Sequence, residues 1–321
     1  MSPAAAVVER RPLSKEVAAR AALLSLRARA AADALLAGHH RSVRHGASAV
    51  FVEHREYRPG DDPRRLDWRA FARTDRPTVR HFEHEAQLRA TLAFDRSSSM
   101  YFGDPPPAET PTKAEHAATL LAALAYLLLR QGDAFGLTYV DRDAELSHPP
   151  RSRPDHFDDL LGSLATNERP PERSASRATS LATALTSIAE RSHRHGVVVL
   201  ASDLLDPDGL ATSAVPPPWC APIALMARRG QTVLVLHTLT RTELLLPGTE
   251  PARFEGLEGE PPTDADPAVV GPRYRDRVSR FCADAERGIT AAGGRYVLTR
   301  TDEAPALALA RLLSSGPRGR T

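Results

Sequence analysis

The sequence contains little cysteine and almost no lysine. Cys220 and Cys282 have no partner at metal-ligand spacing, which argues against a disulfide framework or a zinc site and fits a reducing cytoplasm. Lys15 and Lys113 are the only lysines, so arginine supplies the other 40 (42 − 2) of the positively charged residues. We interpret this excess as a coding bias rather than a functional signal.

Long apolar runs are also missing. The longest, from Ala117 to Leu129, is interrupted by Thr119 and is shorter than the roughly 18 consecutive apolar residues of a membrane-spanning helix. Residues 1–11 include arginines but no apolar core of a signal peptide. The net charge of +2 (42 − 40) gives no reason to expect a nucleic-acid partner. We therefore expect a cytoplasmic protein with no membrane span and no nucleic acid.

What the sequence does contain is an alternation of strand and helix patterns. Its 321 residues suit one large α/β domain with additions, or two modest domains. Apolar strand patterns alternate with helix patterns, which predicts a mostly parallel, doubly wound sheet with helices on both faces. The strands are expected at 90–95, 135–140, 197–200, 232–239 and 296–298, and the helices at 113–130, 181–189, 220–229, 273–292 and 304–313. Residues 244–262 interrupt this alternation with Pro, Gly and Glu, which suggests a hairpin or a loop excursion.

The N-terminal part has a different pattern. Residues 14–37 predict a helix that Ser14 can cap and Gly38 ends, and residues 49–58 and 78–84 predict strands. The organisation that follows is an N-terminal helical segment over 1–46, a small β extension over 47–89, an α/β domain over 90–313 and a flexible tail over 314–321.

Carboxylates and hydroxyls follow the predicted strands. Asp95, Ser97 and Ser99 come directly after the first, Asp203 follows the valine-rich strand, and Thr179 precedes the middle helix. In a doubly wound sheet, sites lie beyond the carboxyl ends of the strands. Oxygen ligands without His or Cys suit one Mg²⁺, with Mn²⁺ the next choice. The alternative is that these residues only form turns and that Thr179 only caps its helix.

A segment upstream of these residues is more specific. Residues 55–74, REYRPGDDPRRLDWRAFART, resemble the signature of domain-of-unknown-function family 58, which precedes a von Willebrand factor A-type domain. The resemblance covers about residues 35–300. It implies a Rossmann-like von Willebrand factor A domain behind the N-terminal helix and the β extension.

The candidate ligands fit the same resemblance. Asp95-x-Ser97-x-Ser99, with Thr179 and Asp203, resembles the metal-ion-dependent adhesion site of von Willebrand factor A domains. The resemblance implies that the hydroxyls coordinate the ion directly, and that the two aspartates act directly or through water. It leaves one position for an acidic residue of a partner. This sequence departs from the pattern at residue 96, where an arginine would place a competing cation beside the ion.

The resemblance also implies partners. Members of the family commonly accompany MoxR-type AAA+ ATPases, and an adaptor role in the assembly or maturation of client proteins is inferred. The charges of the signature segment form either a self-paired network that locks the β extension or a docking surface for a partner. The docking residues would be Arg64, Arg65, Asp67, Trp68, Arg69 and Arg73.

Three functions remain open on the sequence. The first is a non-enzymatic, metal-dependent protein-interaction module. The second is a Mg²⁺-dependent phosphatase-like enzyme with Asp95 as nucleophile, which is disfavoured because Ser97 stands where a second acid is usual and no lysine follows the later strands. The third is a structural domain with a vestigial metal site. The chain has no phosphate-binding loop of the G-x-x-x-x-G-K-[ST] type, so we do not expect it to bind ATP itself.

Overall fold

The structure, a computed structural model, describes residues 14–39, 54–56, 78–80, 87–104, 110–140, 148–166, 180–205, 216–257 and 261–314. The chain divides into two compact units, residues 1–37 with 88–321, and residues 38–87. In the smaller unit β1 (His54–Glu56) pairs antiparallel with β2 (Thr78–Arg80). The larger unit carries the candidate site.

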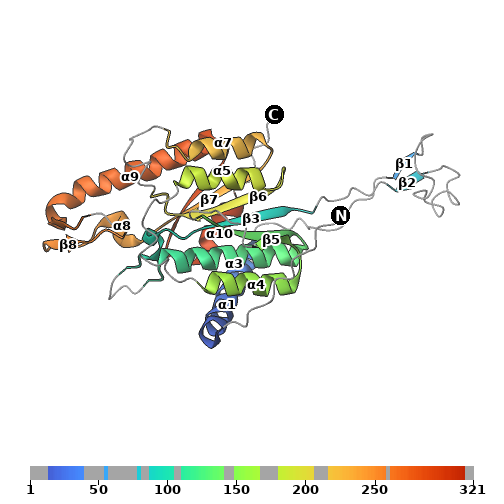
Figure 1. Cartoon of the computed structure of the whole chain (residues 1–321), viewed down its shortest axis with the longest axis horizontal. Coiled ribbons are helices and arrows are strands. Elements are labelled where there is room, and N and C mark those ends of the chain that lie inside the picture. Colours follow the sequence, from blue (N-terminus) through green and yellow to red (C-terminus); the bar gives the residue numbers. More distant parts are fainter. Residues whose placement is uncertain are drawn as a thin grey trace, which may run out of the picture. The chain divides into compact units, whose positions relative to one another are not determined.

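A six-stranded sheet forms the centre of the larger unit (Figure 1). Its order is β10-β7-β6-β3-β4-β5, and every neighbouring pair is parallel except β4 with β5. The winding changes direction between β3 and β6, which is where the carboxyl ends of strands open a crevice in such sheets. The strands are β3 (Arg89–Asp95), β4 (Ala134–Val140), β5 (His148–Arg151), β6 (Val197–Ser202), β7 (Thr232–Leu239) and β10 (Arg295–Arg300).

Helices cover both faces of this sheet, as the apolar strands predicted (Figure 1). Successive strand side chains point to opposite faces, so Leu92 and Phe94 of β3 belong to one hydrophobic cluster and Ala93 to the other. The first cluster includes α1 (Lys15–His39), α3 (Lys113–Gln131), α4 (Pro154–Ala165) and α10 (Pro305–Ser314). The second includes α5 (Leu181–Arg191), α7 (Cys220–Arg228) and α9 (Pro267–Ala291).

The N-terminal helix α1 packs on the first face. Its apolar residues Leu24, Ala28 and Leu35 are buried in the same cluster as α3. Ser14 Oγ accepts a hydrogen bond from the backbone N of Val17 at 3.3 Å, so the predicted cap is confirmed. The helix runs to residue 39, so the prediction that the glycine at 38 ends it was wrong. No helix among the described residues is long and apolar enough to cross a membrane.

Helix α3 starts at the carboxyl edge of the sheet, after β3 and its loop. Thr112 caps it and forms a capping box with Glu115, and Gly132 ends it in the left-handed conformation with φ 78°. Most of the helix is buried. Its first residue, Lys113, therefore lies next to the end of β6, where its Nζ bonds to Asp203.

The elements β5 and α4 were not predicted from the sequence. β5 contains two consecutive prolines, a composition that ordinary strand patterns exclude. It pairs with β4 where Gly136 leaves room, because a Cβ at that position would lie 2.4 Å from the carbonyl oxygen of His148. The hairpin or loop excursion expected over residues 244–262 is an antiparallel pair of β8 (Ala252–Phe254) with β9 (Thr263–Ala265). It follows the short helix α8 (Arg241–Leu245).

Candidate functional site

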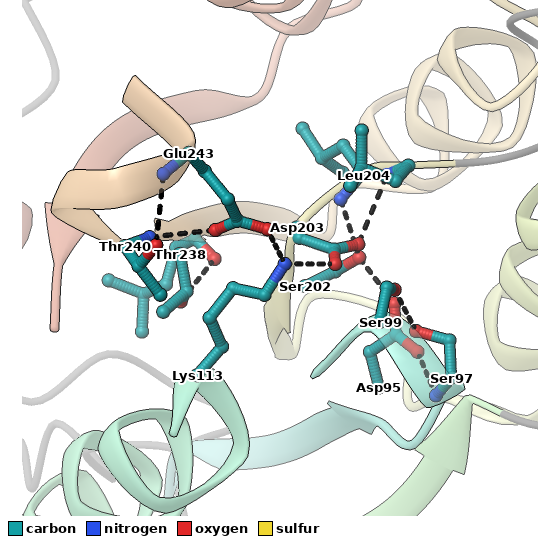
Figure 2. Close-up of polar contacts among 12 residues, drawn as sticks. Asp95, Ser97, Ser99, Lys113, Ser202, Asp203, Leu204, Thr238, Thr240 and Glu243 are labelled. Carbon is teal, nitrogen blue, oxygen red and sulfur yellow. Dashed lines mark hydrogen bonds and ion pairs between the residues drawn. The ribbon is translucent and has the colours of Figure 1, made fainter. Parts of the chain in front are cut away.

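Three of the predicted ligands meet where β3 ends (Figure 2). The carboxylate of Asp95 accepts hydrogen bonds from the backbone N of Ser97 at 2.8 Å and from Oγ of Ser202 at 2.5 Å. The hydroxyl oxygens of Ser97 and Ser99 are 3.1 Å apart. Asp95 and Ser99 are buried, at 6% and 7% exposure. The loop therefore gathers one carboxylate and two hydroxyls at the sheet edge.

Asp203 follows β6, the neighbour of β3, and is fully buried. One carboxylate oxygen accepts from the backbone N of Leu205 at 3.1 Å, and the other accepts from Lys113 Nζ at 2.7 Å. Leu204 has φ 57°, a left-handed conformation that is costly for a branched side chain and persists only where surrounding contacts impose it. Its backbone N donates to Ser202 Oγ at 2.9 Å. This tight turn places Ser202 against Asp95 at the end of β3 and Asp203 against Lys113.

The fifth predicted ligand, Thr179, lies outside the described residues. The cap of α5 is Ser180, whose Oγ accepts from the backbone N of Thr183 at 3.3 Å, so the alternative of Thr179 as that cap was wrong. The predicted docking residues also lie outside the described part of the chain. They are Arg64, Arg65, Asp67, Trp68, Arg69 and Arg73.

The sequence interpretation missed Lys113. Its side chain is fully buried, and Nζ donates to Asp203 and also to Oε1 of Glu243. Glu243 belongs to α8, where it closes a capping box with Thr240. Figure 2 shows Asp203 between this ammonium and the loop of Asp95. One buried cation thus joins the start of α3, the end of β6 and α8.

Electrostatics at the edge follow from burial and from the pairing of charges. Burial raises the pKa of Asp95 to about 7, and the negative charge of Asp203 acts in the same direction. Burial acts to lower the pKa of Lys113, but Asp203 and Glu243 outweigh it, so this pKa is raised and the ammonium stays charged. A cation at Asp95 would therefore compete with the proton that this carboxyl retains near neutral pH.

The described residues fit one small, hard cation. Asp95, Ser97 and Ser99 offer a carboxylate and two hydroxyl oxygens, and oxygen donors of this kind are those that Mg²⁺ and Mn²⁺ prefer. Within the described part of the chain, no three His, Cys, Asp or Glu side chains form a metal-binding group. The serine hydroxyls would therefore have to contribute to the coordination.

The sequence placed a competing cation at Arg96, but the cation paired with Asp203 is Lys113. The guanidinium carbon of Arg96 lies 4.6 Å from the ring centroid of Tyr139. A sequence signal for Lys113 did exist. It is one of two lysines in an arginine-rich chain and the first residue of a largely apolar helix, where the helix dipole disfavours a cation.

Comparison with known proteins assigns the family. The family described as "protein of unknown function DUF58" matches residues 53–280. The chain belongs to this family. Two relatives of this DUF58 protein are the uncharacterized proteins Mb1516 of Mycobacterium bovis and Rv1480 of Mycobacterium tuberculosis. Each is 28% identical over 313 residues, which cover 95% of this chain and 91% of the relative.

Two of the solved structures that are similar to this DUF58 protein come from Bacteroides. BatB from Bacteroides thetaiotaomicron, a conserved hypothetical protein, shares 16% identity and covers 71% of this chain and all of its own, with a TM-score of 0.42. An aerotolerance-related membrane protein from Bacteroides fragilis, with multiple mutations to serine, shares 16% identity. It covers 71% of this chain and 98% of its own, with a TM-score of 0.43.

Proposed function

We propose that this DUF58 protein is a non-enzymatic, metal-dependent protein-interaction module with a site of the von Willebrand factor A type. One Mg²⁺ or Mn²⁺ would be held by Asp95, Ser97 and Ser99, with Asp203 and Thr179 completing the set. The observation that supports this proposal is the convergence at the switch point. Two serine hydroxyls 3.1 Å apart lie beside the end of β3, and a second carboxylate follows β6.

The chemistry of these donors suits the recruitment of an acidic partner. Hydroxyl ligands are neutral and leave most of the ion's charge unbalanced. Asp203 is already partly neutralised, because Lys113 binds one of its carboxylate oxygens. A carboxylate from another protein would therefore gain strongly by entering the coordination of the ion. The site would then bind its partner only when the metal is bound.

We further propose that the partners are a MoxR-type AAA+ ATPase and a client protein that offers an acidic residue. The module would act as adaptor between them in the assembly or maturation of the client. Family membership supports this part of the proposal through the resemblance of residues 55–74. A cytoplasmic location belongs to the same proposal and is supported by the two free thiols, Cys220 and Cys282.

Serine variants test the metal site directly. The full chain is titrated with Mn²⁺, and free Mn²⁺ is followed by electron paramagnetic resonance, with and without excess Mg²⁺. Ser97→Ala and Ser99→Ala should each weaken binding at least tenfold, whereas Ser98→Ala, in the same turn, should leave it unchanged. Equal binding by all three variants and the wild type would remove the metal site from the proposal.

The partner is tested with the same variants. A MoxR-type ATPase should be retained by the wild-type protein in Mg²⁺ and lost in EDTA or with Ser99→Ala. If the ATPase is still retained in EDTA and by Ser99→Ala, the interaction does not depend on the metal. The variants Trp68→Ala and Arg69→Ala then test whether the signature segment binds the ATPase instead. The vestigial-site alternative predicts no metal binding even with the partner present.

The phosphatase alternative gains nothing from Lys113. The ammonium is fully buried and already bonded to two carboxylates, so it is not placed to neutralise a phosphate. Asp95-dependent turnover of a phosphate ester in Mg²⁺ would nevertheless replace the proposed function with an enzyme.

A further inference from the structure

Lys113 places a permanent positive charge within the edge that carries the candidate ligands. Its Nζ lies 2.7 Å from Asp203 Oδ2 and also contacts Glu243, and the side chain has no solvent exposure. A surface lysine could move into water when another cation arrives. Here that movement would leave two carboxylates without their counterion, which is strongly unfavourable in a buried position.

Two capped helices, α3 and α8, fix the position of this ammonium. Thr112 caps the first turn of α3, so the backbone of Lys113 cannot drift. Glu243 is held by the capping box of α8. The backbone N of Thr242, also in α8, donates to Asp104 Oδ1 at 3.0 Å, which ties α8 to the segment that leads into α3.

We propose that Lys113 is a positioning residue that sets the affinity of the sheet edge for a divalent cation. It takes one oxygen of Asp203 and repels an ion at Asp95, Ser97 and Ser99, so that the edge binds the ion weakly by itself. Tight binding then requires the additional carboxylate of a partner. This inference rests on the proposed metal site and deepens it, because it explains why ion and partner would bind together.

Charge and burial support the sign of this effect. Asp203 stands between the ammonium and the Asp95 loop (Figure 2), and Asp95 and Asp203 are close enough for their charges to interact. Salt screens charges weakly where water is excluded. A second cation at this edge is therefore opposed by the first. Glu243, the second carboxylate bonded to the ammonium, has the opposite effect on cation affinity. It neutralises part of the Lys113 charge and so leaves less of that charge to act on Asp203.

A purely structural role for Lys113 predicts the reverse. If the ammonium only kept Asp203 in place, its removal would displace a candidate ligand and weaken binding. The direction of the change in metal affinity therefore separates the two roles. This readout is independent of any activity of the protein.

The experiment measures Mn²⁺ affinity of the full chain, without partner, for wild type and Lys113 variants. Lys113→Met should tighten binding at least tenfold, and Lys113→Arg, which keeps the charge, should stay within about threefold of wild type. Glu243→Gln should weaken Mn²⁺ binding, because it leaves more of the Lys113 charge to act on Asp203. If circular dichroism shows that Lys113→Met is unfolded, the double variant Lys113→Met with Glu243→Gln takes its place. The double variant leaves fewer buried carboxylates without a counterion.

The outcomes separate this inference from the proposed function. Tighter binding by the methionine variants supports the role of Lys113, even where the wild type alone binds too weakly to detect. If the wild type binds Mn²⁺ and the methionine variants bind it equally well or more weakly, the proposed role of Lys113 is overturned, but the metal site is not. Failure of every folded variant to bind Mn²⁺ overturns both.

Discussion

The buried ammonium of Lys113 donates a 2.7 Å hydrogen bond to the carboxylate of Asp203, which lies 90 residues later in the chain. This contact connects the helix that follows β3 with the strand on the other side of the switch point. The consequences of this contact and of other buried groups can be measured without knowledge of any partner.

Loss of the Lys113 charge should destabilise the fold. Lys113→Ala leaves Asp203 and Glu243 buried or partly buried without their counterion, and removal of one member of a buried ion pair typically costs about 3–5 kcal/mol. Lys15→Ala is the matched control, because it removes the chain's other lysine, which is exposed on α1. Urea unfolding gives both values, and similar small losses for the two variants would contradict the prediction.

His116 should make the protein less stable in mild acid. Burial lowers the pKa of His116 to about 4 from the ordinary value of 6.5, and its Nε2 lies 3.0 Å from Thr299 Oγ1. The unfolded chain binds a proton in this range and the folded chain does not, so stability falls as pH drops from 6.5 to 4. The loss attributable to this side chain is at most about 3 kcal/mol.

His116→Gln should remove this part of the pH dependence, measured by urea unfolding at pH 7 and pH 4.5. His193→Gln, at an exposed position, serves as control. A pH profile that is the same in His116→Gln and the wild type would contradict the assignment.

Gly136 should be required for the attachment of β5. A Cβ there would lie 2.4 Å from the carbonyl oxygen of His148 and 2.8 Å from the backbone N of Pro150, so Gly136→Ala must push β5 away at a cost of about 2 kcal/mol. Gly132→Ala is the comparison. It strains a left-handed residue with φ 78° but meets no neighbour. Hydrogen exchange at the backbone amides of His148 and Arg151, the two non-proline residues of β5, should accelerate only in Gly136→Ala. Equal exchange in both variants would argue against the steric role.

Cys220 should resist thiol reagents in the folded protein. It is 5% exposed, and burial raises the pKa of its thiol to about 11. The thiolate is the reactive form, so iodoacetamide at pH 8 should leave Cys220 unmodified until the chain is unfolded. Peptide mass spectrometry with and without urea checks this, and rapid labelling of the native protein would contradict it.

Much of the fold could be predicted from the order of apolar segments. Strand β7 and helix α3 match their sequence patterns closely, because continuous apolar strands and a helix that is apolar nearly all round carry strong local signals. β5 was missed because its stability depends on the room beside Gly136 rather than on its own composition. α4 was missed although Phe157, Leu160, Leu161 and Leu164 lie at helical spacing in the sequence. The end of α1 was misplaced because a glycine can remain helical where neighbouring residues are packed.

The sequence by itself determined which candidate ligands would follow the strands. Asp95, Ser97, Ser99 and Asp203 had to reach one edge, since parallel strands end on the same side of a sheet. Only the tertiary structure decided what Asp203 binds. Lys113 pairs with Asp203 and Glu243 across 90 and 130 residues. Such contacts depend on how α3, β6 and α8 pack together, and no local pattern in the chain encodes them.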